Sequence, residues 1–343
     1  MAKYSEFMAL MKQHKDIQVM PVSDIVNPVS NETGSASLDL QLHMPFPGGN
    51  QHEIFGPPGV GKTTIALSIL GYAQRRGQHV AYVNEEGTLN KSLLETIPSI
   101  DMGGVDEDGN PTFSIINTPY AELSMEAVRA FIEQPNVVIA VDSIDSMVPK
   151  SIMESGFEDQ HMGTVGKLMS RVCRDFAKIL MRTGSAIIWL NQIRDKIGSY
   201  HGGHVTSGGH AVRFYSNQRI ELKNVPKTNY IEEDGVRIGM KVPYYITKNK
   251  CVPPYIKGEI PIKFGFGIWE SLDLLDVAMT LGIMPPPKQG RTMPLVEWAQ
   301  FNPPFNCDGE KTVFVKHMIP FLDESPEACK VLRDKVEVII RGI

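Results

Sequence analysis

The sequence predicts an α/β fold built on a mainly parallel sheet, and three observations support this prediction. From about residue 37 to residue 270, apolar runs of strand length alternate with stretches of helical length. The run VVIAV at 137–141 is apolar throughout, as expected of a strand that is buried on both faces. The stretch GPPGVGKTT, from Gly56 to Thr64, follows a strand and precedes an apolar helix, which is the context of a phosphate-binding loop.

Taken in order, the expected elements begin with a short helix at 4–14, where apolar residues cluster at helical spacing, and a short strand at 17–22. A polar segment rich in Ser, Asn and Gly follows at 22–36 and is expected to be a linker. The next expected strands lie at 52–55, 79–84, 113–118, 136–142 and 185–193, and the helices between them at 63–76, 88–96, 122–133 and 162–182. Closely spaced antiparallel strands are then expected at 218–223, 240–248 and 258–263.

This pattern divides the chain into three expected parts. Residues 1–34 form an N-terminal arm and linker, which can bury little surface alone and therefore pack on the body or on a neighbouring subunit. Residues 35–270 form the α/β core. Residues 271–343 form a small, proline-interrupted α+β C-terminal domain, which begins with a helix at 271–283 and ends with one at 323–341.

The composition is that of an ordinary soluble globular protein, with 343 residues, 42% hydrophobic and 21% charged. No apolar run approaches the roughly 20 residues of a membrane span and the charged N-terminus is no secretory signal, so we expect a cytoplasmic protein without membrane partners. The four cysteines are widely scattered, which argues against a zinc site or a disulfide framework. The net charge is −5, yet residues 161–223 hold ten Lys and Arg against three acids.

The glycine-rich loop has the chemistry of a nucleotide phosphate cradle. Its backbone N–H groups surround the phosphates, Lys62 reaches the β and γ oxygens, and the Thr63 hydroxyl faces Mg²⁺. A glycine-rich turn alone would not explain the Lys-Thr-Thr sequence and the apolar helix behind it. The residues expected to bind the nucleotide here are Gly56, Pro57, Pro58, Gly59, Val60, Gly61, Lys62, Thr63 and Thr64. Kinases, GTPases, helicases, transporters and recombinases share such a loop, so its use stays open at this point.

Three other strand ends supply candidates for the rest of the nucleotide site. Asp142 ends the buried strand at the edge where ligands bind in open α/β sheets, and we expect it to join Thr63 in holding Mg²⁺. Either Glu85 or Glu86 emerges at the same edge and would orient water for attack on the γ-phosphate. The amide of Gln192, at the end of another strand, could report whether that phosphate is present. Each of these residues alone is also compatible with an ordinary polar strand end.

The most unusual stretch runs from 194 to 215, RDKIGSYHGGHVTSGGHAVRFY. Its two glycine pairs allow the backbone to approach a phosphate backbone closely, and Arg194, Lys196 and Arg213 add positive charge. A disordered surface loop is the alternative. The three histidines of this stretch do not have the spacing of a metal site.

At this point the chain resembles the bacterial RecA recombinase family, from about residue 35 to residue 343 and with the N-terminal arm also in place. The matching stretches occur in the family's order: SASLDL, the phosphate loop, the acid after AYVN, VDSIDSMVPK, EDQHMG, LNQIRDKIG, SGGHAVRFY and ITKNKCVPP. The resemblance implies a RecA-like ATPase core at 35–270 with two DNA-binding loops, and a polymerisation arm at 1–34. It also implies ATP- and Mg²⁺-dependent filament formation on single-stranded DNA, then homologous pairing and strand exchange with duplex DNA.

The resemblance further assigns catalytic roles. It implies that Glu86 orients the attacking water, that Gln192 senses the γ-phosphate, and that Lys62 binds it. Lys248 and Lys250 match a pair that reaches ATP across the subunit interface. Two lysines two residues apart on one strand point to the same face, so they could jointly stabilise phosphate charge.

Two loops carry the implied DNA contacts, the first at about 155–163 and the second at 193–210. Lys167, Ser170 and Arg174 follow the first loop at spacings of three and four, so they share one helix face. The residues implied to bind DNA are Met162, Lys167, Ser170, Arg174, Arg194, Lys196, Ile197, Gly198, Gly208, Gly209, His210 and Arg213.

Some positions depart from the family pattern. Asn90, which we still expect to bind ATP, replaces a usual Asp, and Leu93 replaces an aromatic residue that stacks on adenine. The chain also lacks the acidic tail of many members, and such drift suits a phage-encoded or divergent relative, which would act in the host cytoplasm. Two other functions stay open: a ring helicase or other hexameric DNA-dependent ATPase, supported only by the negative net charge, and a scaffold that binds nucleotide without turnover.

Overall fold

The computed structural model describes residues 5–6, 9–10, 27–154, 163–195, 204–283, 292–294, 312–314, 319 and 322–342. Its main strands are β1 (Asn50–Gly56), β2 (Val80–Asn84), β3 (Phe113–Ile116), β4 (Val138–Asp142), β5 (Ala186–Asp195), β6 (His204–Thr206), β7 (Ser216–Leu222), β8 (Tyr230–Glu233), β9 (Val236–Asn249), β10 (Lys257–Lys263) and β11 (Gly267–Ile268). They form one eleven-stranded sheet in the order β11-β10-β9-β7-β1-β5-β4-β2-β3, with β6 beside β5 and β8 beside β9.

The sheet combines a parallel half with an antiparallel half. β3, β2, β4, β5, β1 and β7 pair in parallel. From β7 onward, β9, β10 and β11 pair in antiparallel fashion. All five residues of β4 are buried, in line with its apolar sequence. The predicted α/β class with a mainly parallel sheet is therefore confirmed.

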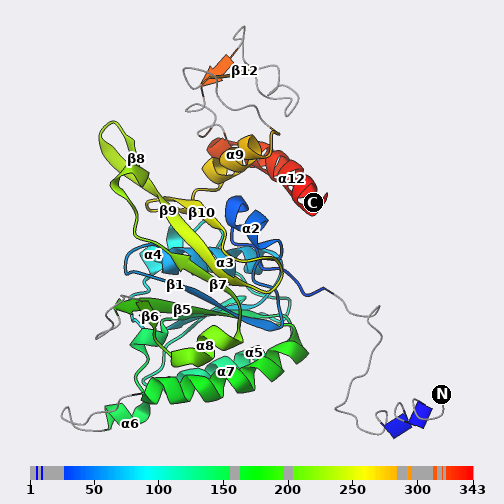
Figure 1. Cartoon of the computed structure of the whole chain (residues 1–343), viewed down its shortest axis with the longest axis vertical. Coiled ribbons are helices and arrows are strands. Elements are labelled where there is room, and N and C mark those ends of the chain that lie inside the picture. Colours follow the sequence, from blue (N-terminus) through cyan, green and yellow to red (C-terminus); the bar gives the residue numbers. More distant parts are fainter. Residues whose placement is uncertain are drawn as a thin grey trace.

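Helices cover both faces of the sheet (Figure 1). They are α2 (Ala36–Leu42), α3 (Lys62–Arg75), α4 (Lys91–Glu95), α5 (Ala121–Ile132), α6 (Lys150–Met153), α7 (Thr164–Thr183), α8 (Gly209–Tyr215), α9 (Glu270–Thr280) and α12 (Pro326–Gly342). One buried core lies between the sheet and α2, α3 and α4, and a second lies between the sheet and α5, α7 and α8. The parallel half of the sheet is thus buried on both sides, so the ends of its strands are the accessible part.

The long helix α7 shows why these residues form these elements. Its buried side chains Met169, Val172 and Phe176 recur at spacings of three and four and pack on the second core. Gly163 before the helix and Gly184 after it adopt φ values of 79° and 72°, a left-handed conformation that glycine adopts readily.

A third core joins α9 and α12 to α2, through side chains such as Leu274, Leu275, Leu332 and Val336. The sheet ends at Ile268 and α9 begins at Glu270. The short strands β12 (Thr292–Pro294) and β13 (Thr312–Phe314) form a separate pair. The three-part division at 34 and 270 stays a prediction, since α2 packs as closely on α9 as on the core sheet.

Several local expectations differ from the structure. Residues 31–36, expected to belong to a polar linker, are largely buried: Asn31 donates to the Phe46 carbonyl (2.7 Å) and the Thr33 backbone N–H donates to Asp39 (3.0 Å). The polar side chains here serve turns and a helix start, which composition alone does not distinguish from a linker. Helix α8 was not expected either. Most of the expected N-terminal helix and strand lie outside the described residues, and no helix in the described part of the chain is long and apolar enough to span a membrane.

Candidate functional site

The phosphate loop connects β1 to α3 at the carboxyl edge of the parallel strands, where open α/β sheets bind ligands. Gly59 and Gly61 adopt φ values of 73° and 95°, which side chains rarely tolerate. A Cβ on Gly61 would lie 2.6 Å from Cδ1 of Ile262, so the loop also runs close to β10. The two glycines therefore shape the cradle and bring it against the antiparallel half of the sheet.

Lys62 begins α3 and is only 7% exposed. Its ammonium donates to the carbonyls of Gly56 (3.1 Å) and Pro57 (2.7 Å), which hold it folded over the loop. Burial lowers the pKa of Lys62, while the nearby Asp142 and Glu86 carboxylates favour its charged form. An anion bound at the loop would offset the free-energy cost of burying the Lys62 charge, because it would supply a partner of opposite charge.

The structure brings together the two residues expected to hold Mg²⁺. The Thr63 hydroxyl donates to Oδ2 of Asp142 at 2.5 Å, and the Tyr82 hydroxyl donates to the same oxygen at 2.6 Å. Asp142 is almost fully buried, and this burial raises its pKa. A hydroxyl and a carboxylate are oxygen ligands of the kind that Mg²⁺ prefers. Mg²⁺ in nucleotide sites usually takes only one or two protein ligands together with phosphate oxygens and waters, and this pair fits that pattern.

Glu86 lies in a hydrogen-bonded group at the same edge. Its Oε1 accepts from the Ser143 hydroxyl (2.9 Å) and from the Gln192 amide (3.1 Å). The backbone N–H groups of Glu85 and Glu86 both donate to the Asp142 carbonyl, at 2.8 and 3.1 Å. The Glu85 side chain instead lies near Ser124 on α5, and burial raises its pKa. Of the two alternatives, Glu86 is therefore the carboxylate placed beside the phosphate loop.

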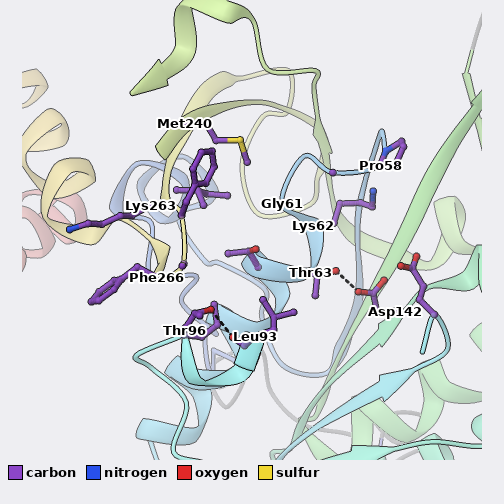
Figure 2. Close-up of a pocket in the computed structure, with 18 of the residues that line it drawn as sticks. Pro58, Gly61, Lys62, Thr63, Leu93, Thr96, Asp142, Met240, Lys263 and Phe266 are labelled. Carbon is purple, nitrogen blue, oxygen red and sulfur yellow. Dashed lines mark hydrogen bonds between the residues drawn. The ribbon is translucent and has the colours of Figure 1, made fainter. Parts of the chain in front are cut away.

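A cavity of about 370 Å³ opens beside the phosphate loop, and its lining includes Lys62, Thr63, Glu86, Asp142 and Gln192. Figure 2 shows Lys62, Thr63 and Asp142 at one end of it and Lys263, Phe266, Met240 and Leu93 at the other. The cavity is completed by residues from α4 and from the turn between β10 and β11: Leu93, Thr96, Ile97, Lys263, Phe264, Gly265, Phe266 and Gly267. Except for Leu93, sequence reasoning missed this end, because its residues come from distant segments that share no motif.

Asn90 does not line this cavity. Its side-chain oxygen accepts from the backbone N–H of Leu93 (2.9 Å) and caps the N-terminus of α4. The structure thus gives Asn90 a local helix-capping role and places Leu93, rather than Asn90, at the cavity wall.

The base of the second predicted DNA loop is anchored next to this site. Asn191 donates both to Oε1 of the buried Glu53 (2.9 Å) and to the Ser207 carbonyl (2.9 Å). Glu53 in turn pairs with the buried Arg219. Successive residues on β5 point to opposite sides. Gln192 therefore contacts Glu86 while Asn191 holds the returning end of the loop.

The predicted DNA-binding residues fall into two groups. Lys167, Ser170 and Arg174 are exposed on one face of α7, as their spacing predicts, and His210 and Arg213 are exposed on α8. Gly208 and Gly209 start α8 with left-handed φ values of 79° and 71°. Met162, Lys196, Ile197 and Gly198 lie outside the described residues, and Arg194 is described only as part of the β5 backbone.

Comparison with known proteins identifies the family. A family model described as the RecA N-terminal domain matches residues 7–269. The chain belongs to the RecA family. It is similar to Protein RecA of Thermus aquaticus, with 34% identity over 255 residues, or 74% of this chain and 72% of that protein. Protein RecA of Aquifex pyrophilus is 33% identical over 271 residues, which cover 78% and 74% of the two chains. Membership of the RecA family favours a RecA-type recombinase over a ring helicase.

Two lysines expected to act across a RecA-family subunit interface lie away from the cavity in the single chain. The Lys248 ammonium donates to the carbonyls of Arg213 (2.8 Å) and Phe214 (2.9 Å), in α8. Burial, with help from the neighbouring Lys250 and Arg219 charges, lowers the pKa of Lys248 to about 8. The sequence predicts that Lys248 and Lys250 share one strand face. In the structure β9 ends at Asn249, so Lys250 follows the strand and this prediction is wrong. Neither lysine lines the nucleotide cavity of its own chain.

Proposed function

We propose that this RecA-family chain is a DNA-dependent ATPase that forms helical filaments on single-stranded DNA and catalyses pairing and strand exchange with homologous duplex DNA. The observation that supports this most directly is the contact between Gln192 and Glu86. This contact joins the candidate catalytic acid, Glu86, to β5, the strand that leads into the second predicted DNA loop. A nucleotide-dependent change at Glu86 would thereby reach the proposed DNA site.

Different residues of the cavity have different proposed roles in ATP hydrolysis. Lys62 and the loop N–H groups bind the phosphates, and Thr63 with Asp142 would hold Mg²⁺, which would neutralise developing phosphate charge. Glu86 accepts a hydrogen bond from the attacking water and orients it in line with the γ-phosphate. Ser143 and Gln192 fix the direction of the carboxylate through their hydrogen bonds to Oε1. The other carboxylate oxygen is then left to face the water.

The proposed coupling to DNA runs through adjacent residues of β5. Release of the Gln192 amide toward a γ-phosphate would change the position of the β5 end. Asn191, the preceding residue, hydrogen-bonds the backbone of Ser207 on the far side of the loop. Both described ends of the loop are therefore held by the same strand, and a nucleotide-dependent shift of β5 would reach both of them.

The test is ATP hydrolysis by the full chain with and without single-stranded DNA, together with electron microscopy of the same sample. We expect DNA to stimulate hydrolysis and helical filaments to form with ATP and DNA. Closed hexameric rings, or hydrolysis that no length of single-stranded DNA stimulates, would contradict the proposal.

Replacing Lys248 with alanine tests the subunit-interface site. We expect filament-dependent hydrolysis to fall roughly 100-fold, because a cation that stabilises the transferring phosphate is lost. Nucleotide binding to the dilute single chain should stay within error, since Lys248 does not line that chain's own cavity. Fluorescent-nucleotide titration and turnover assays separate the two quantities.

Lys241→Ala is the matched control, because Lys241 lies on the same strand and pairs instead with Asp276 (2.6 Å). Its turnover should be close to that of the unaltered chain. Equal loss of binding and turnover in Lys248→Ala would argue against action across an interface.

A further inference from the structure

An exposed row of basic side chains runs along α7. Lys167, Arg171, Arg174 and Lys178 stand at successive spacings of four, three and four residues, which places them on one helix face. All four are exposed. At a rise of about 1.5 Å per residue, the row extends over about 16 Å. We call these four residues the α7 basic row.

The row points directly away from the protein core. The buried side chains of α7, including Met169, Val172, Phe176 and Ile179, lie on the opposite side of the helix. These apolar contacts hold the helix in place without involving the row, so the basic side chains have no role in packing. Figure 1 shows α7 at the outside of the molecule, in the helical layer that also holds α5 and α8.

The charge of the row is compensated little within its own helix. Asp175 is the single acid in α7, and it lies 3.8 Å from Arg171 with both side chains largely exposed. Such a surface pair contributes little and is easily exchanged for another anion. Arg182, at the end of the helix, is excluded from the row because it pairs with Glu133.

We propose that the α7 basic row is one continuous track for the phosphates of nucleic acid, in which Arg171 and Lys178 bind phosphates beyond the contacts assigned to Lys167, Ser170 and Arg174. This rests on the proposed function as a DNA-binding protein. At the phosphate spacing of one strand in a duplex, about 3.4 Å along the axis, a row of about 16 Å faces about five phosphates. Its complement is therefore a polyanion with closely repeated charge, and four evenly placed cations read the backbone rather than the bases.

The experiment compares binding of a labelled single-stranded oligonucleotide across a salt series, in the presence of a slowly hydrolysed ATP analogue. The slope of log affinity against log salt is negative, and each lost contact to single-stranded DNA makes it shallower by about 0.7, so R171Q/K178Q should make it shallower by about 1.4. D175N, which frees Arg171, should raise affinity about two- to fivefold at low salt. Unchanged thermal unfolding midpoints would show that the variants fold.

The matched control is K91Q/K330Q, which removes the same net charge from exposed positions on α4 and α12. It should leave the slope unchanged. If the unaltered chain binds DNA and R171Q/K178Q has the same slope, the proposed track is wrong. It is also wrong if the substitutions change only self-association of the chain. That last result would indicate an acidic surface of a second copy, such as the exposed Glu232, Glu233 and Asp234 hairpin. Failure of the unaltered chain to bind single-stranded DNA would refute the proposed function itself.

Discussion

Replacing Lys62 with alanine is expected to lower ATP hydrolysis by at least about 100-fold, both with and without DNA. The Lys62 ammonium is the buried cation at the start of α3, and it is held by loop carbonyls beside the Asp142 and Glu86 carboxylates. Without the Lys62 ammonium, no positive charge of the loop offsets the repulsion between the incoming phosphates and the Asp142 and Glu86 carboxylates. Phosphate release measures turnover, and fluorescent-nucleotide titration measures the accompanying loss of binding.

Lys91→Ala is the control for this change, because Lys91 is an exposed lysine of α4 whose ammonium lies 3.6 Å from Glu95 and which does not line the cavity. We expect its turnover to stay near that of the unaltered chain. If Lys62→Ala retained full nucleotide-dependent turnover, the phosphate loop would not be the site of hydrolysis.

The second large effect is expected for Glu86→Gln, which should slow hydrolysis about 100- to 1,000-fold while nucleotide binding and filament formation persist. The amide has the size of the carboxylate and can still accept from the Ser143 hydroxyl, which donates to Glu86 at 2.9 Å. It lacks the negative charge that makes the Glu86 carboxylate a strong hydrogen-bond acceptor for the attacking water. Filaments of this variant should therefore form with ATP and disassemble slowly, which electron microscopy and single-turnover phosphate release can follow.

Glu85→Gln provides a close control, since the two glutamates are adjacent in sequence. Glu85 lies near Ser124 and does not line the nucleotide cavity. Its turnover should change about twofold at most, in the range of a substitution away from the reacting groups. A larger loss for Glu85→Gln than for Glu86→Gln would reverse the proposed roles.

The sequence allowed prediction of the phosphate end of the site because its residues follow strand ends or form one continuous motif. Lys62 and Thr63 lie in the motif. Asp142 ends β4, Glu86 follows the end of β2, and Gln192 lies where β5 stops pairing with β1, so all three lie at one edge of the parallel strands. Their assembly then follows from the parallel topology. Their chemical roles stay proposals, to be tested as above.

The other end of the cavity could not be predicted in the same way. Met240, Phe264 and Phe266 reach it from the antiparallel strands and turns of the sheet, whose register depends on long-range pairing. Helix α8 was also missed, because its two initial glycines favour a loop by propensity. In the structure these glycines supply the left-handed start of the helix, and the packing of Val212 stabilises it.

The positions of Asn191 and Gln192 in β5 limit which insertions and deletions this strand can tolerate. Asn191 and Gln192 are neighbours, yet one side chain anchors Ser207 and the buried Glu53 while the other contacts Glu86. Substitutions elsewhere in β5 alter one contact at a time. Insertion or deletion of a single residue would turn both amides to the wrong faces at once. The length of this strand is thus constrained by two requirements together, and relatives should vary in its composition far more readily than in its number of residues.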